Sequence, residues 1–169
     1  NKIPAQCRVF IIGDLTVMEQ AKKFTGSSVA MHPMKTLEDL EEGRINVLDM
    51  QLVKPADFTM GTENARCGRA SYDYVLKGIS LARDGQIHGD VTNPINKSSL
   101  KKAGIDFPGH TEIFAHETGS TNFSIVFMLE NVYVIYVTTH CSLREAIERI
   151  TSERVYSKIL LLNSALQST

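Results

Sequence analysis

The chain has 169 residues, of which 43% are hydrophobic and 22% are charged, and its formal net charge is −1. This length suits one domain, or a piece of a larger protein, and the composition is ordinary for a soluble globular fold. A near-neutral charge gives no reason to expect nucleic acid or an anionic membrane as a partner, and no apolar run is long enough to span a bilayer. The three cysteines form no CxxC motif, which favours reduced thiols in a cytoplasmic protein.

The first half of the chain alternates predicted strands and helices. Residues 8–14, RVFIIGD, are typical of a buried strand that ends at a turn, and TVMEQAKKF has helical spacing with Thr16 as its expected cap. Within residues 26–69, RINVLDMQ suggests a strand and KPADFTMGTENARCG a loop. A helix is predicted over residues 71–85, and QIHGDVT, residues 86–92, is predicted as a short strand.

The second half continues the alternation. NKSSLKKAG predicts a short helix capped by Asn96, and a further helix is expected to begin at or near Thr111. Residues 124–140 suggest two strands joined as a hairpin at Glu130-Asn131. SLREAIERI carries a capping box of Ser142 and Glu145, and SERVYSKILLLNSAL predicts one more helix. This order of elements indicates α/β layers with some antiparallel pairing.

Three segments carry candidate site residues, each expected where a strand gives way to a helix. Ligands of open α/β sheets gather at such positions, beyond the carboxyl ends of the strands. The first holds Lys97, whose charge adds to the anion-attracting start of a helix, and the second holds His110 and Thr111. The third holds His140, which could bind a metal or shuttle a proton. Each segment alone also fits a capped surface helix or a structural histidine, but together they predict one pocket for an anionic ligand.

Several other kinds of site are disfavoured. The sequence has no GxGxxG after the first strand, no Walker A motif and no GxSxG elbow. A zinc site made only of His110, His116 and His140 is possible, but His116 is expected to be exposed. A thiol nucleophile at Cys141 is disfavoured, because neighbouring residues of a strand point to opposite faces.

The three segments resemble the PdxA family, the 4-hydroxythreonine-4-phosphate dehydrogenases of vitamin B6 biosynthesis. The elements Thr-x-Pro-Ile-x-Lys (residues 92–97), Gly-His-Thr-Glu (109–112) and Thr-Thr-His-x-x-Leu-Arg (138–144) occur here in the family's order. CGRASYDYVLKGISLARDG is also similar to the family's helix before the first element. The likeness covers nearly the whole chain and is weak in residues 25–60.

The resemblance implies an isocitrate/isopropylmalate-dehydrogenase-like α/β fold and a cytoplasmic homodimer with its active site at the subunit interface. It implies NAD-dependent oxidation of 4-phosphooxy-L-threonine, followed by loss of carbon dioxide, with zinc, magnesium or cobalt held by histidines of both subunits. His140 matches a metal ligand, and His110 and Thr111 match the substrate-binding pair. Lys97 matches a motif lysine, and its catalytic role is inferred from its charge. No residue is assigned to NAD binding.

The resemblance also implies that residues 1–169 are a single α/β segment, roughly half of such an enzyme, without the family's N-terminal opening and C-terminal portion. We expect this segment to be inactive by itself. Relatives that act on D-threonate or D-erythronate 4-phosphate, or on cis-dihydrodiols, share the motifs and stay open as alternatives. A non-catalytic module that binds a phosphorylated ligand is a second class of function, and a phosphotransacetylase-like enzyme that uses coenzyme A is a third.

Overall fold

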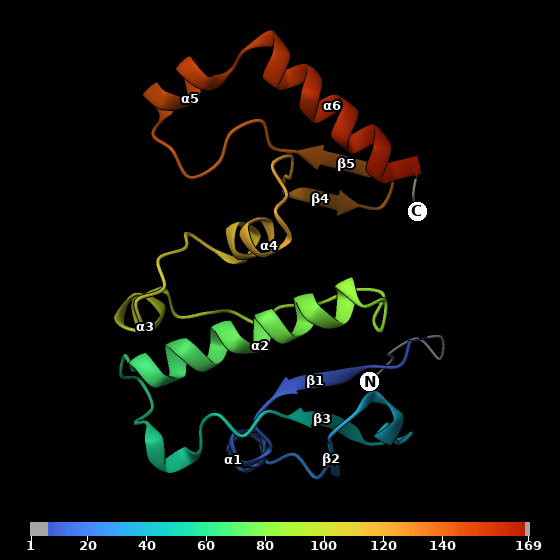
Figure 1. The fold of residues 1–169 in the computed structure, drawn as a ribbon, viewed down its shortest axis with the longest axis vertical. Coiled ribbons are helices and arrows are strands. Elements are labelled where there is room, and N and C mark those ends of the chain that lie inside the picture. The colour runs from blue at the N-terminus through green and yellow to red at the C-terminus, as the bar shows by residue number, and fades with distance from the viewer. Residues whose placement is uncertain (1–6, 168–169) are drawn as a thin grey trace. The chain divides into compact units, whose positions relative to one another are not determined.

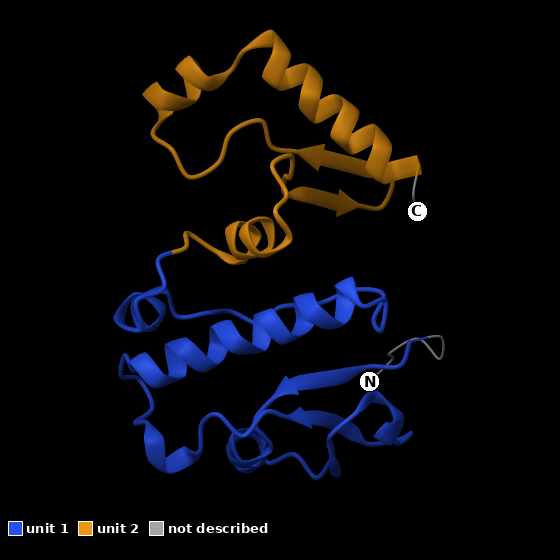
Figure 2. Cartoon of the chain, in the orientation of Figure 1, with its two compact units in different colours: residues 1–106 blue, residues 107–169 orange. Residues whose placement is uncertain are grey.

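The computed structural model describes residues 7–167, which fall into two compact units (Figure 1). Unit 1 runs to Asp106 and unit 2 begins at Phe107 (Figure 2). No helix in residues 7–167 is long and apolar enough to cross a membrane.

Unit 1 is built on a three-stranded parallel sheet in the order β1-β3-β2. The strands are β1 (Phe10–Gly13), β2 (Met31–Met34) and β3 (Ile45–Asp49), and α1 (Leu15–Thr25) connects the first two. The three middle residues of the central strand β3 are buried, as expected of a parallel strand covered on both faces. Two 3₁₀ turns, Leu37–Asp39 and Pro55–Asp57, flank β3 along the chain.

Two helices complete unit 1. The long helix α2 (Ala65–Arg83) lies along the sheet in Figure 1, and its Leu81 packs with Met34 and Leu48 in the hydrophobic core. The short helix α3 (Lys97–Lys102) packs closely against α2. This arrangement of a parallel sheet under helices confirms the predicted α/β class.

Unit 2 contains an antiparallel hairpin and three helices. The hairpin pairs β4 (Val126–Leu129) with β5 (Val132–Ile135). The helices are α4 (His110–Thr118), α5 (Leu143–Arg149) and α6 (Ser152–Gln167). Two hydrogen bonds tie α6 to the segments that flank the hairpin: Lys158 Nζ donates to the Phe123 carbonyl at 2.6 Å and Arg154 Nε to the Val137 carbonyl at 2.8 Å.

Some of the predicted elements need correction. Residues 86–92 form no strand, and β2 was not predicted. The α2 helix begins at Ala65, inside the stretch expected to be a loop. Thr16 is not the cap of α1: Asp14 occupies the cap position, with no side-chain capping bond. The hairpin, the Asn96 cap and the Ser142–Glu145 capping box are confirmed.

Candidate functional site

The first motif, residues 92–97, lies on irregular backbone that leads into α3. The Asn96 side chain accepts a hydrogen bond from the Ser99 N–H at 2.8 Å, which fixes the start of this helix. Lys97 is the first residue of α3 and is exposed to solvent. Because residues 86–92 form no strand, this motif does not sit at the end of a sheet as the sequence suggested. It is positioned by α2 and α3 instead.

A close approach of α2 and α3 holds the first motif in place. A Cβ atom on Gly68 of α2 would collide with the Ser99 backbone, so only glycine lets the two helices come this near. The Asn64 N–H, at the cap of α2, donates to Ser99 Oγ at 3.1 Å. These contacts fix the turn of α3 that begins with Lys97.

The lysines of α3 differ in their surroundings. Lys102 Nζ lies 2.8 Å from a carboxylate oxygen of Glu63, and hydrogen bonding to Lys102 lowers the pKa of that carboxyl below its usual value. The charge of Lys102 is therefore already compensated. Lys97 has no ion-pair partner within residues 7–167, which leaves it the better candidate for an anionic ligand.

The second motif forms the start of α4. Gly109 occupies the cap position and gives no side-chain capping bond, so Thr111 lies inside the first turn and does not cap the helix. The first N–H groups of a helix lack partners within the helix, and the cap residue Gly109 has no side chain to supply one. The Nε2 atom of His110 is buried and has no hydrogen-bond partner among the described residues. His110 and Thr111 thus bring one orphaned imidazole nitrogen and one hydroxyl to the same helix turn.

The third motif meets the second through Glu112. His140 Nε2 lies 3.7 Å from Glu112 Oε1, a distance that suits an ion pair with a protonated ring but exceeds a hydrogen bond. The other carboxylate oxygen of Glu112 is buried without a partner among the described residues. Within unit 2, the structure therefore places His110, Glu112 and His140 in two motifs that touch each other.

The backbone of the third motif also departs from expectation. His140 does not end a strand, because β5 stops at Ile135 and the intervening residues are irregular. Its φ of 53° lies in the left-handed region, which is uncommon for a residue with a side chain. Neither His140 nor Cys141 belongs to a strand, so the expectation that they point to opposite faces of one is wrong.

The contact between Glu112 and His140 was not predicted from the sequence. As an acidic residue in the first turn of α4, Glu112 also suits the positive end of the helix dipole. No local pattern links Glu112 to His140, because the two residues lie far apart along the chain. The one hint of this contact in the sequence was that both residues belong to recognisable motifs.

His140 fits one position of a metal site. Its imidazole is half exposed and has a carboxylate beside it, a donor set suited to a divalent ion. The described residues contain no group of three or more histidine, cysteine, aspartate or glutamate side chains that could hold a metal. His116 stays exposed next to Glu117, at 2.9 Å, so the set His110, His116 and His140 is not assembled. A complete site needs donors beyond these residues.

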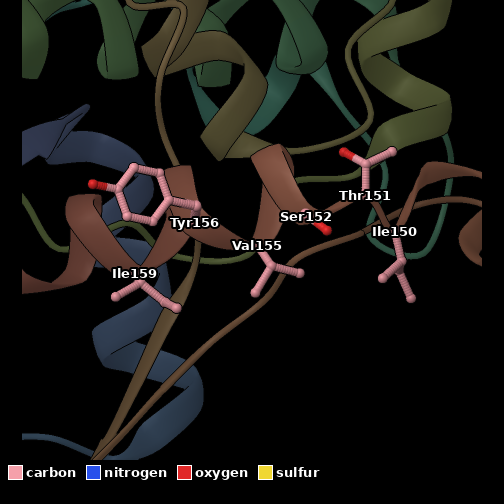
Figure 3. A pocket seen from close by; sticks show the side chains of 6 residues that line it. All are labelled: Ile150, Thr151, Ser152, Val155, Tyr156 and Ile159. Carbon is pink, nitrogen blue, oxygen red and sulfur yellow. The ribbon is translucent and has the colours of Figure 1, made fainter.

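A shallow hollow on α6 offers no alternative site. It is lined by side chains without charge: Ile150, Thr151, Ser152, Val155, Tyr156 and Ile159 (Figure 3). None of the three motifs contributes to it. The hollow lacks the charged and metal-ligating groups that the chemistry of the motifs requires.

Comparison with known proteins agrees with the motifs. A family model described as "Pyridoxal phosphate biosynthetic protein PdxA" matches residues 5–169. A D-threonate 4-phosphate dehydrogenase from Cupriavidus necator is 34% identical over 152 residues, which is 89% of this chain and 45% of that protein. A crystal structure of a 4-hydroxythreonine-4-phosphate dehydrogenase from Burkholderia phymatum aligns with a TM-score of 0.85 and 34% identity, covering 96% of this chain and 49% of that one.

A second solved relative gives the same result. The 4-hydroxythreonine-4-phosphate dehydrogenase from Klebsiella pneumoniae aligns with a TM-score of 0.87 and 27% identity over 94% of this chain and 49% of its own. The chain spans about half the length of the curated relatives it matches, 49% and 50% for those from Fusobacterium nucleatum and Symbiobacterium thermophilum. With a family model matched over almost all of its residues, and with the isocitrate-dehydrogenase-like fold of its solved relatives, this chain belongs to the PdxA family of dehydrogenases.

Proposed function

We propose that residues 1–169 form part of an NAD- and metal-dependent dehydrogenase that oxidises 4-phosphooxy-L-threonine in vitamin B6 biosynthesis. The observation that carries this proposal is the presence of all three family motifs, two of which meet through Glu112 and His140. The solved relatives are named for this activity. We also propose that the complete protein is a homodimer whose site is shared between subunits.

Each site residue has a role that suits its surroundings. His140 would supply one imidazole ligand to a divalent metal, which when bound acts as a Lewis acid on the substrate's secondary hydroxyl. His110 and Thr111 would hydrogen-bond the substrate, because both stand where the first turn of α4 lacks a side-chain cap. Lys97 would pair with the phosphate or carboxylate, since no described carboxylate neutralises it.

The oxidation itself belongs to the cofactor. When bound, NAD⁺ would accept a hydride from the carbinol carbon, and loss of the hydroxyl proton as well would give a β-keto acid that can lose carbon dioxide. The protein's part is to orient the substrate and to hold its anionic groups in place.

D-threonate 4-phosphate is the second candidate substrate. It is favoured by the name of the Cupriavidus necator relative, which is as similar to this chain as the solved Burkholderia phymatum protein. The two substrates share a phosphorylated four-carbon acid with a secondary hydroxyl, so Lys97, His110 and Thr111 suit both. Measuring kcat/KM for each substrate with the same enzyme separates them.

The decisive variant is His140→Ala in a full-length dehydrogenase that contains residues 1–169. Removing a first metal ligand should lower metal affinity and kcat/KM by at least about 100-fold, because even the partners of such ligands contribute 10- to 100-fold. Circular dichroism should be unchanged. His116→Ala is the matched control, since this histidine is exposed and lies outside the motifs. Full turnover by His140→Ala would exclude the assignment, and binding of sugar phosphates without NADH formation would favour a non-catalytic module.

A further inference from the structure

Glu112 differs from two other glutamates of unit 2 in what its carboxylate contacts. Glu117 lies 2.9 Å from its neighbour in the chain, His116. Glu145 accepts hydrogen bonds from the N–H and the hydroxyl of the residue that caps its own helix, α5. Both of these contacts are local. The ion-pair partner of Glu112 within the described residues is His140, which lies far along the chain on the segment after β5.

The carboxylate of Glu112 is held in place by burial. The side chain is only 23% exposed, and its Oε2 atom is buried without a hydrogen-bond partner among the described residues. This oxygen lies beside the start of α4, 3.4 Å from where a Cβ atom of Gly109 would be. Buried polar atoms are nearly always paired in folded proteins, so an exception calls for a specific explanation. Here the buried half of the carboxylate keeps the other oxygen, Oε1, directed at His140.

The ring of His140 has few other restraints. Its side chain is half exposed, and its backbone is held in the left-handed region on an irregular segment. Nδ1 makes no hydrogen bond within residues 7–167, whereas Nε2 faces Glu112. An exposed side chain samples several rotamers unless a neighbour selects one of them. Among the described residues, Glu112 is the neighbour in a position to select the rotamer of His140.

We propose that Glu112 is a positioning residue for His140, whose ring it restrains in the orientation that binds the metal. A histidine that ligates a metal almost always has its second ring nitrogen held by a carboxylate, a carbonyl or water. The separation of 3.7 Å between Nε2 and Oε1 brings the carboxylate close enough to serve this purpose after a small rotation of the half-exposed ring. The inference rests on the proposed function, because it takes His140 to be a metal ligand. Glu112 acts through His140 and is not itself a ligand.

The test is a double-mutant cycle on zinc affinity in a full-length dehydrogenase that contains residues 1–169. Competition with a chelator measures the affinity without any need for turnover. Glu112→Gln removes the charge and keeps the shape of the side chain, and it should weaken zinc binding by about 10- to 100-fold. In a His140→Ala background the same substitution should change the affinity by less than about twofold, because a residue that acts only through His140 has nothing left to position.

Glu117→Gln is the matched control. Glu117 lies on the same helix, its side chain is 26% exposed, and its histidine partner, His116, lies outside the motifs. Zinc affinity should be unchanged in this variant. Circular dichroism checks the fold of each protein. If Glu112→Gln does not fold, Glu112→Asp takes its place in the cycle, since it keeps the charge and withdraws the carboxylate by one methylene group.

The outcomes separate this inference from the proposed function. Unchanged zinc affinity in Glu112→Gln, together with a loss in His140→Ala, would overturn the positioning role and leave the proposed function in place. An equal loss from Glu112→Gln in both backgrounds would also overturn it, because Glu112 would then bind zinc independently of His140. Unchanged affinity in His140→Ala would overturn both.

Discussion

Asp14 shows how a single buried charge organises unit 1. The side chain is only 3% exposed and accepts hydrogen bonds from the Leu52 N–H at 2.9 Å, the Val53 N–H at 2.5 Å and the Tyr74 hydroxyl at 2.7 Å. These bonds join the end of β1 to the loop after β3 and to α2. They also explain why Asp14 gives α1 no side-chain cap: its carboxylate oxygens are already occupied by other donors.

Tyr74→Phe should destabilise unit 1 by about 1.5–3 kcal/mol, the usual contribution of a hydrogen bond to a charged group. Burial, followed by the hydrogen bond to Asp14, raises the pKa of Tyr74 well above its ordinary value. A pKa that is higher in the folded state contributes stability below the unfolded value of about 10, and this stability is lost as the pH rises further. Urea unfolding from pH 7 to 11 should therefore show a steeper alkaline loss in the wild type than in Tyr74→Phe. Tyr156→Phe, at an exposed tyrosine, is the control, and identical slopes for wild type and Tyr74→Phe would contradict the role of Asp14.

At the scale of elements, Gly68 and Gly78 of α2 differ in the kind of atom that packs against them, backbone in one case and side chain in the other. Alanine is ordinarily the better helix former by about 1 kcal/mol. A Cβ on Gly68 would meet the Ser99 backbone, which cannot move without α3, whereas a Cβ on Gly78 would meet the Asp90 carboxylate, which can rotate. Gly68→Ala should thus lower the free energy of unfolding by about 1–3 kcal/mol, with a smaller change for Gly78→Ala. Equal urea midpoints for the two variants would show that the α2–α3 contact is softer than the structure indicates.

Elements held by local bonds were predictable from the sequence. The Asn96 cap, the Ser142–Glu145 capping box and the hairpin turn at Glu130 each depend on residues a few positions apart. Residues 86–92 were predicted wrongly because a strand also needs a partner, which the sequence pattern does not specify. There Ile87 packs against the core while Val91 is exposed.

Strand β2 and the Glu112–His140 contact were both missed from the sequence, for different physical reasons. Strand β2 contains Pro33, which has no N–H to donate, but it lies at the edge of the sheet, where such a residue is tolerated. The candidate residues Lys97, His110, Thr111 and His140 could be selected from their motifs. The Glu112–His140 contact could not, because it depends on the course of the chain through the hairpin.

At the scale of the whole molecule, the core is divided unevenly between the units. The most deeply buried side chains of unit 1 include Met34, Val47 and Leu100, whereas β4, β5, α5 and α6 of unit 2 bury none. Regions with few buried apolar contacts open at lower free energy than the global unfolding of a domain. Residues 1–169 should therefore behave as a well-packed unit joined to one that opens readily.

Native-state hydrogen exchange of the purified chain tests this division. After correction for intrinsic rates, amides of β3 and α2 should exchange at least about tenfold more slowly than those of β5 and α6, a difference of about 1.4 kcal/mol in opening free energy. Helix α4 is the internal control: it belongs to unit 2 but buries Ile113 and Ala115, so its protection should fall between the two groups. Equal protection in β3 and β5 would mean that the hairpin is stabilised by contacts among residues 107–167 that outweigh its exposed apolar surface.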